Sequence, residues 1–275
     1  MNPLLLCARH ELLLAVRSRW LQIFAGVFAG LSLAVASAGY VLSGGYGLQD
    51  FGRTAASLIQ VVLLLVPLTA LTFGALALTP ERGAAELLFA QPVSRWRILA
   101  GRYLGLLVSL AAAQAIGFGL AGLVLYQDGG ALGLSGFLAV VGVSLTLTMV
   151  FLSIAAMLAQ SGVGRRARVL ALALIVWFVA VVLYDVAVLG VASLLHSAGA
   201  SRLLMTAALA NPVDAARTVA FTAVEGTAAF GAASLALLRF TGSLVATLLL
   251  AGASLAAWTA LPLIVAARRL GRADL

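Results

Sequence analysis

Apolar and polar positions alternate along this chain in long blocks, and the blocks predict six membrane-spanning helices. An α-helix needs about 20 predominantly apolar residues to cross the hydrocarbon core of a bilayer. Six stretches meet that length with few or no charges, at residues 20–42, 57–78, 99–126, 134–160, 169–194 and 244–267. The pattern therefore predicts an all-α membrane protein whose residues 1–275 form a single transmembrane domain.

Residues 3–19 precede the first predicted span and mix apolar and charged positions at helical spacing. Leucines and a valine oppose charged residues: Leu4, Leu5, Leu12, Leu13 and Val16 against Arg9, Glu11, Arg17 and Arg19. This pattern predicts an interfacial helix that lies on the membrane surface. A plain extension of the first span is the alternative.

The segment between the second and third predicted spans has the pattern of a short exposed helix. Pro80 suits a first helical turn, and Pro92 ends the helix because proline lacks an amide proton. Glu81 and Glu86 lie near the positive end of that helix, which favours carboxylates. An apolar patch follows, made of Leu87, Leu88 and Phe89. The segment is predicted to be a docking surface.

The arginines set the orientation of the predicted bundle. All 17 basic residues are arginine, and 13 of them fall on one side: Arg9, Arg17, Arg19, Arg82, Arg95, Arg97, Arg102, Arg165, Arg166, Arg168, Arg268, Arg269 and Arg272. Arg102 lies at the start of the third span, where we expect its side chain to extend toward water. The positive-inside rule then predicts that both termini are cytoplasmic.

On the outer side, residues 196–242 form a long segment that polar residues interrupt too often for further spans. We predict short helices at the outer interface. Asn211, Pro212 and Asp214 have the spacing of a helix start, with a capping side chain, a first-turn proline and an early acid. Arg217 follows on the same face. These four residues form either a partner-binding platform or a lid over the bundle.

Composition supports the membrane class and excludes several chemistries. Hydrophobic residues make up 63% of the chain and charged residues 9%, far from the mix of a soluble domain. The net charge of +8 lies in arginine clusters between apolar runs, which argues against nucleic-acid binding. The chain has no lysine, so it has no P-loop of the usual form, and ATP must bind another polypeptide. No dense metal-ligand spacing is present.

Asp185 is the acid nearest the middle of a predicted span, and an intramembrane carboxylate is a functional candidate. The structural alternative for Asp185 is an ion pair with an arginine such as Arg202.

A soft-metal path is a second candidate. It would use Met149, Met157, Met205 and His196, although methionines also fill irregular space between helices.

Small residues recur four positions apart, as in Gly26 with Gly30 and Gly101 with Gly105. Such pairs allow close helix packing, but a chain generally rich in glycine and alanine would also contain them.

Residues 133–136 resemble the G-x-S-G motif of rhomboid intramembrane proteases, which also have a six-span core. Ser135 would be the nucleophile. In that family a histidine inside a span faces the serine, whereas His196 lies just beyond the fifth predicted span. The histidine and asparagine that rhomboids carry on an earlier span are also missing. We interpret the motif as a small-residue turn, with a rhomboid-like protease as the enzyme alternative.

The docking segment resembles a stretch found in permease subunits of ABC-2 type (type V) ABC transporters. The matching positions are Glu81, Arg82, Gly83, Glu86, Leu87, Leu88, Gln91, Pro92, Ser94 and Arg95. Ala84 stands where the family usually has threonine, which removes one polar contact. Three other regions resemble permeases of the system that matures nitrous oxide reductase. They are the start of the chain, the fifth span with Trp177 and Asp185, and the outer segment from Asn211 to Gly226.

The resemblance implies a non-catalytic subunit that forms a homodimer, with each copy docked onto an ATPase subunit that holds ATP and Mg²⁺. It also implies an outer partner, a periplasmic β-helix protein, together with a copper chaperone. This chain itself would bind no cofactor or metal. The alternative within the family is an exporter of a lipid, drug or peptide.

Overall fold

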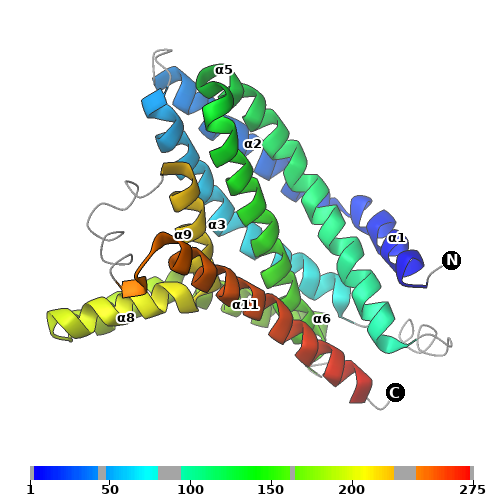
Figure 1. Cartoon of the computed structure of the whole chain (residues 1–275). Coiled ribbons are helices and arrows are strands. Elements are labelled where there is room, and N and C mark those ends of the chain that lie inside the picture. Colours follow the sequence, from blue (N-terminus) through cyan, green and yellow to red (C-terminus); the bar gives the residue numbers. More distant parts are fainter. Residues whose placement is uncertain (1–2, 43–47, 80–93, 162–164, 226–239, 273–275) are drawn as a thin grey trace.

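The computed structural model describes residues 3–42, 48–79, 94–161, 165–225 and 240–272, and every regular element in these residues is helical. The helices are α1 (Pro3–Val16), α2 (Arg19–Leu42), α3 (Leu48–Leu78), α5 (Arg95–Ala159), α6 (Arg166–Phe178), the π-helix η1 (Val179–Leu183), α7 (Tyr184–Ser193), α8 (Ser197–Ala210), α9 (Pro212–Glu225) and α11 (Leu244–Arg272). Figure 1 shows their arrangement. The all-α prediction is confirmed.

Six helical stretches in the described residues are long and apolar enough to cross a membrane, and they coincide with the six predicted spans. They are Arg19–Ala38, Gly52–Leu78, Arg95–Val124, Leu134–Ala159, Arg166–Ser193 and Leu244–Arg272. The third and sixth run further toward their arginine-rich ends than predicted. Those arginines are helical, and their long side chains can reach beyond an apolar region.

The α5 helix differs from the prediction, because it holds two spans without an intervening loop. Helical backbone continues through residues 127–133, where the sequence predicted an outer loop, and α5 folds back on itself there (Figure 1). No proline occurs between Arg95 and Ala159, so no residue in this stretch lacks a backbone N–H donor. The glycines of the turn still permit the reversal.

The α5 hairpin is the centre of the bundle, and α1, α2, α3, α9 and α11 pack against it. Near the fold of the hairpin, Phe118 lies edge-on to Phe28 of α2 and to Phe137, with ring centroids 5.1 and 5.9 Å apart. Edge-to-face pairs are the favoured geometry for aromatic rings. These rings join α2 to both arms of α5.

A buried polar network fixes the register of the two arms of α5. Gln114 on one arm donates from Nε2 to the Thr148 hydroxyl at 2.8 Å, and its Oε1 accepts from the Ser144 hydroxyl at 2.7 Å. All three side chains are buried. Polar groups inside an apolar bundle must be paired internally, so sliding one arm by a turn would break these bonds.

The described part of the outer segment contains α8 and α9, and α9 is packed into the bundle. The α8 helix returns along α7, and α9 then packs against α3, α5 and α11. Each has 14 residues, which span about 21 Å and cannot cross about 30 Å of hydrocarbon. Asn211, at the junction, is only 4% exposed. Short helices were predicted correctly, but the start of α9 is buried rather than lying on the surface.

Candidate functional site

Most of the predicted ATPase-docking segment lies outside the described residues, which resume at Ser94. The residues beyond it are Glu81, Arg82, Gly83, Glu86, Leu87, Leu88, Phe89, Gln91 and Pro92. The two ends of the segment are described. Before it, the Thr79 hydroxyl donates to the Ala75 carbonyl at 2.5 Å. After it, Arg95 donates from Nη1 to the Leu270 carbonyl at 3.0 Å, which ties the start of α5 to the end of α11.

Arg102 joins three helices instead of simply extending to water. Its Nε donates to Glu11 Oε2 of α1 at 3.0 Å, and its Nη2 donates to the Ala77 carbonyl at the end of α3. The Glu11 residue is only 6% exposed. A buried carboxylate needs a paired cation, and Arg102 supplies one. The sequence predicted that the Arg102 side chain would extend toward water; in the structure it is 26% exposed and bonded to α1 and α3.

Two glycines of α5 allow α1 to pack against it at backbone distance. A Cβ atom at Gly101 would lie 2.7 Å from the Leu4 carbonyl oxygen, and one at Gly105 would lie 2.5 Å from that of Ala8. Both distances are too short for a side chain. The sequence indicated this pair correctly, but its partner is α1 rather than another span. Gly26 and Gly30 have open space around them and make no such approach.

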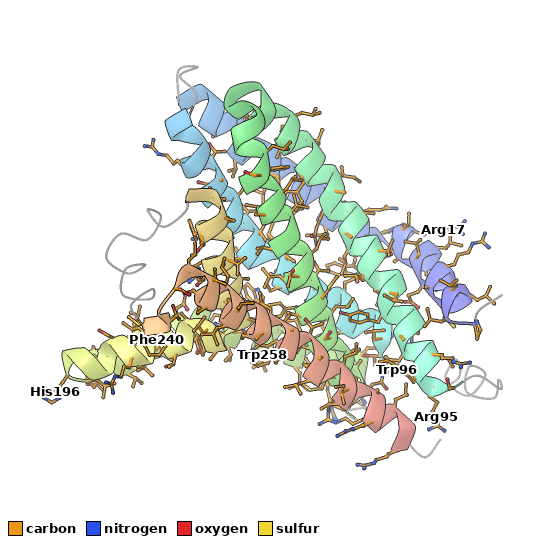
Figure 2. The ribbon with its side chains drawn as sticks, viewed as in Figure 1. Arg17, Arg95, Trp96, His196, Phe240 and Trp258 are labelled. Carbon is orange, nitrogen blue, oxygen red and sulfur yellow. The ribbon has the colours of Figure 1, made fainter. Side chains whose placement is uncertain are left out.

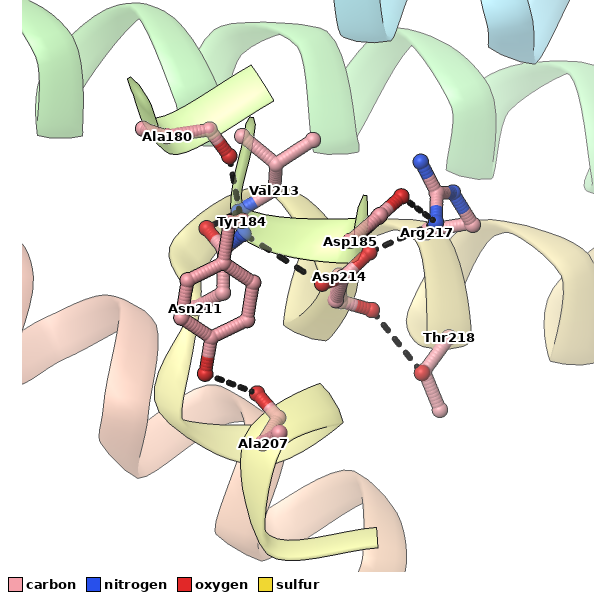
Figure 3. Close-up of polar contacts among 9 residues, drawn as sticks. All are labelled: Ala180, Tyr184, Asp185, Ala207, Asn211, Val213, Asp214, Arg217 and Thr218. Atoms are coloured by element: carbon pink, nitrogen blue, oxygen red, sulfur yellow. Dashed lines mark hydrogen bonds and ion pairs between the residues drawn. The ribbon is translucent and has the colours of Figure 1, made fainter. Parts of the chain in front are cut away.

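A second polar site joins the fifth span to α9 (Figure 3). Arg217 contacts two carboxylates through Nη1, Asp185 Oδ2 of α7 at 3.2 Å and Asp214 Oδ1 at 2.6 Å. Asp214 lies one turn before Arg217 on α9, so helical spacing alone brings those two together. Asp185 comes from a different helix. The predicted ion pair of Asp185 therefore exists, but its partner is Arg217 and not Arg202.

Asn211 holds the start of α9 in place with both ends of its amide. Its Oδ1 accepts the backbone N–H of Val213 at 3.0 Å, and its Nδ2 donates to the Ala180 carbonyl of η1 at 2.8 Å. The first bond is the predicted helix cap. The second reaches a π-helix, whose wider turn disrupts the usual α-helical bonding and is often found at functional sites.

Side chains from the fifth and sixth spans donate hydrogen bonds to backbone carbonyls at the end of α8. The Tyr184 hydroxyl donates to the Ala207 carbonyl at 2.9 Å, and Trp258 donates from Nε1 to the Ala210 carbonyl at 2.8 Å. The Ala210 carbonyl is one of the last four of the helix, which lack intrahelical partners, whereas the Ala207 carbonyl also accepts the Asn211 N–H at 3.1 Å. These two bonds allow α8 to end inside the bundle next to Asn211.

The environment of Asp214 disfavours its ionised form. Burial raises the pKa of Asp214 to about 7, and the nearby Asp185 carboxylate acts in the same direction, while Arg217 opposes both. Asp214 lies on α9, outside the six candidate spans. Its carboxyl group therefore titrates near neutral pH, well above the usual range for aspartate.

The other predicted candidates lie on separate elements. Met149 and Met157 are on α5, Met205 is on α8, and His196 is exposed at the turn before α8, at the end of the bundle opposite Arg95 and Trp96 (Figure 2). Among the described residues, no group of three histidine, cysteine, aspartate or glutamate side chains is placed to hold a metal ion. Ser135 is exposed on α5.

Sequence reasoning missed the Glu11–Arg102 pair and the bond from Asn211 to Ala180. The first pair is separated by 91 positions and the second by 31, and neither spacing has a local signal. The chain did offer one indication for the first pair, because Glu11 is the only acid among the first 49 residues.

Six apolar spans, two of them paired in the central α5 hairpin, define a multi-pass membrane protein. The chain belongs to the ABC-2 family of transporter proteins, whose model matches residues 5–275. It is similar to the probable ABC transporter permease protein NosY of Pseudomonas aeruginosa, at 34% identity over 235 residues, or 83% of this chain and 85% of that protein. The protein of the same name from Stutzerimonas stutzeri is 34% identical over 242 residues, or 86% and 87%.

Proposed function

We propose that this chain is the permease subunit of an ABC transporter and that it couples ATP hydrolysis by a separate ATPase subunit to movement of its six spans. The observation that carries the proposal is the match of residues 5–275 to the ABC-2 family. The lack of lysine supports it, because a P-loop needs a lysine to bind phosphate. ATP and Mg²⁺ would then bind the partner ATPase, and this chain would have no catalytic residue.

We assign ATPase docking to the segment between the second and third spans. Its residues are Glu81, Arg82, Gly83, Glu86, Leu87, Leu88, Phe89, Gln91, Pro92, Ser94 and Arg95. The contacts at its two ends support this role. Arg95 is bonded to α11, and Arg102 is bonded to α1 and α3. A force applied to this segment would reach α5 directly, and α1, α3 and α11 through those bonds.

We further propose that the transporter serves copper-site maturation of nitrous oxide reductase. The similarity to two proteins named NosY over more than four fifths of the chain supports this role. The proposed assembly contains two copies of this chain, two ATPase subunits, a periplasmic β-helix protein received by the outer segment between the fifth and sixth spans, and a copper chaperone. Export of a lipid, drug or peptide is the alternative within the family.

The arginine distribution supports an inner-membrane protein with cytoplasmic termini. Large apolar side chains remain exposed along the fifth and sixth spans, including Ile175, Leu189 and Leu249. These faces are suited to lipid or to a second copy of the chain.

Glu86→Arg tests the docking proposal, because it reverses a charge on the proposed docking helix without touching the described core. Purification of the full chain from its native host in mild detergent should recover the ATPase. With Glu86→Arg, the amount of ATPase recovered should fall at least tenfold, which corresponds to a loss of about 1.4 kcal/mol in binding free energy. The matched control is Arg202→Glu, a charge reversal on the exposed face of α8, which should retain the ATPase.

The proteins recovered with the wild-type chain decide between the functions. An ATPase together with a periplasmic β-helix protein supports the maturation role. An ATPase alone supports export, and equal ATPase recovery with Glu86→Arg and wild type contradicts the docking assignment.

A further inference from the structure

The contact between the fifth span and α9 contains two carboxyl groups and a single guanidinium. Arg217 Nη1 lies 3.2 Å from Asp185 Oδ2 and 2.6 Å from Asp214 Oδ1. The carboxyl groups of Asp185 and Asp214 therefore both face the same nitrogen of Arg217.

The balance of charge favours one bound proton. With both carboxylates ionised, the cluster holds two negative charges and one positive charge. Its surroundings on α9 are apolar, with Val213, Ala215 and Ala216 buried. An unpaired charge is costly in such a setting, and two close carboxylates resist simultaneous ionisation. One proton brings the net charge of the cluster to zero.

No other described charge is placed to replace that proton. Among the described residues, the charged side chains in contact at this cluster are Asp214, Arg217 and Asp185, and Tyr184 is the adjacent neutral titratable group. The other described charged side chains on elements packed against α9 are at a distance along their helices: Arg53 at the start of α3, Arg202 on the exposed face of α8, Arg95, Arg97 and Arg102 at the start of α5, and Arg268, Arg269 and Arg272 at the end of α11.

The cluster lies where the fifth span is weakly held by packing. Asp185 follows the π-helix η1, in which no residue is buried. Near this point the polar links from α9 and its cap are Arg217 to Asp185 and Asn211 to the Ala180 carbonyl. We propose that Asp214 carries one exchangeable proton in its contact with Asp185 and Arg217, and that losing this proton loosens the fifth span from α9 at η1.

The direction of the pH dependence follows from the contact itself. With the proton bound, the two carboxyl groups carry a single negative charge, and Arg217 holds both. Without it, like charges face each other, and Asp185 can move away because its side chain is 38% exposed. The pKa of Asp214 in the closed contact is about 7, while a solvated aspartate titrates near 3.9. Closure is therefore fully favoured at low pH and weakens as the pH rises toward 7.

Infrared spectroscopy of the purified full-length protein tests for the proton directly. We expect the carbonyl stretching band of a protonated carboxyl group to be present in the wild type and to disappear with a midpoint near pH 7. Asp214→Asn should abolish this titrating band, and Asp185→Asn should move its midpoint to lower pH, because Asp214 stays buried but no longer faces a second carboxylate. Glu11→Gln is the matched control and should leave it unchanged, because Glu11 is paired with Arg102 elsewhere. A wild-type spectrum without a titrating band would overturn the proposal without the need for any variant.

The movement is tested by the distance between spin labels at Val186→Cys on α7 and Ala223→Cys on α9, in a Cys7→Ala background. Both label positions are exposed. The distance should lengthen when the pH is raised through about 7, and Asp214→Asn should abolish that shift by keeping the cluster neutral. An unchanged distance in the wild type, or a shift that persists in Asp214→Asn, would disprove the link between the proton and span movement. Neither experiment needs the ATPase, so the result is independent of the proposed function.

Discussion

At the residue scale, the buried acids among the described residues are paired with arginines, and each of these arginines also reaches a further helix. Glu11 is held by Arg102, and Asp214 is held by Arg217 together with Asp185. The sequence identified Asp185 as a candidate because an acid inside an apolar span is conspicuous. It could not identify Arg217 as the partner, because that choice depends on how the α8–α9 turn directs α9 back into the bundle.

A double-mutant cycle on the Glu11–Arg102 pair should show strong coupling. Arg102→Met leaves a buried carboxylate without its cation, which typically costs about 3–5 kcal/mol. Adding Glu11→Leu should recover most of that loss, because an apolar pair of similar size removes the unpaired charge. Thermal unfolding in detergent, followed by size-exclusion chromatography, measures the effect as a change in Tm. Arg97→Met, at an exposed position on the same helix, is the control and should change Tm little.

One result of the double-mutant cycle would contradict this explanation. If the double variant unfolds at the same temperature as Arg102→Met alone, the buried Glu11 carboxylate is not what destabilises the single variant. The lost bond from Arg102 to the Ala77 carbonyl would then account for the effect.

At the element scale, α1 is part of the bundle because α5 has no side chains at Gly101 and Gly105. The sequence predicted a helix here and marked both glycines, since charge spacing and small-residue pairs are local patterns. It did not predict that they meet, because packing partners depend on the whole bundle. The same holds for α5, where glycines at residues 129, 130 and 133 indicated a loop but the backbone stays helical through the turn.

Gly105→Ala should loosen α1 from α5. The new Cβ would lie 2.5 Å from the Ala8 carbonyl oxygen and 2.8 Å from Glu11 Cβ, so α1 must move away. The native Cys7 reports the movement, because it is the single cysteine and its Cβ packs against Gly101. Its rate of reaction with a thiol reagent should rise several-fold. Gly119→Ala, on the same helix with open space around it, should leave the rate unchanged, and an equal rate in both variants would contradict this packing.

At the scale of the whole molecule, the span count and helical class were predictable because lipid imposes a simple length rule on apolar helices. The tertiary arrangement was not. The Gln114 network and the burial of Asn211 depend on contacts between positions 30 or more residues apart. Orientation is a third kind of property, since it follows from where the arginines lie and not from packing.

That orientation predicts opposite accessibility for the two ends of the bundle. Gly271 lies in the last turn of α11 with open space around it, and His196 is exposed at the turn before α8. In a Cys7→Ala background, a membrane-impermeant thiol reagent applied to intact spheroplasts should label His196→Cys and spare Gly271→Cys. Permeabilising the membrane should then allow Gly271→Cys to react, which also serves as the control for its reactivity. Labelling of Gly271→Cys in intact spheroplasts would place the arginine-rich side outside, and the docking segment between α3 and α5 could then no longer meet a cytoplasmic ATPase.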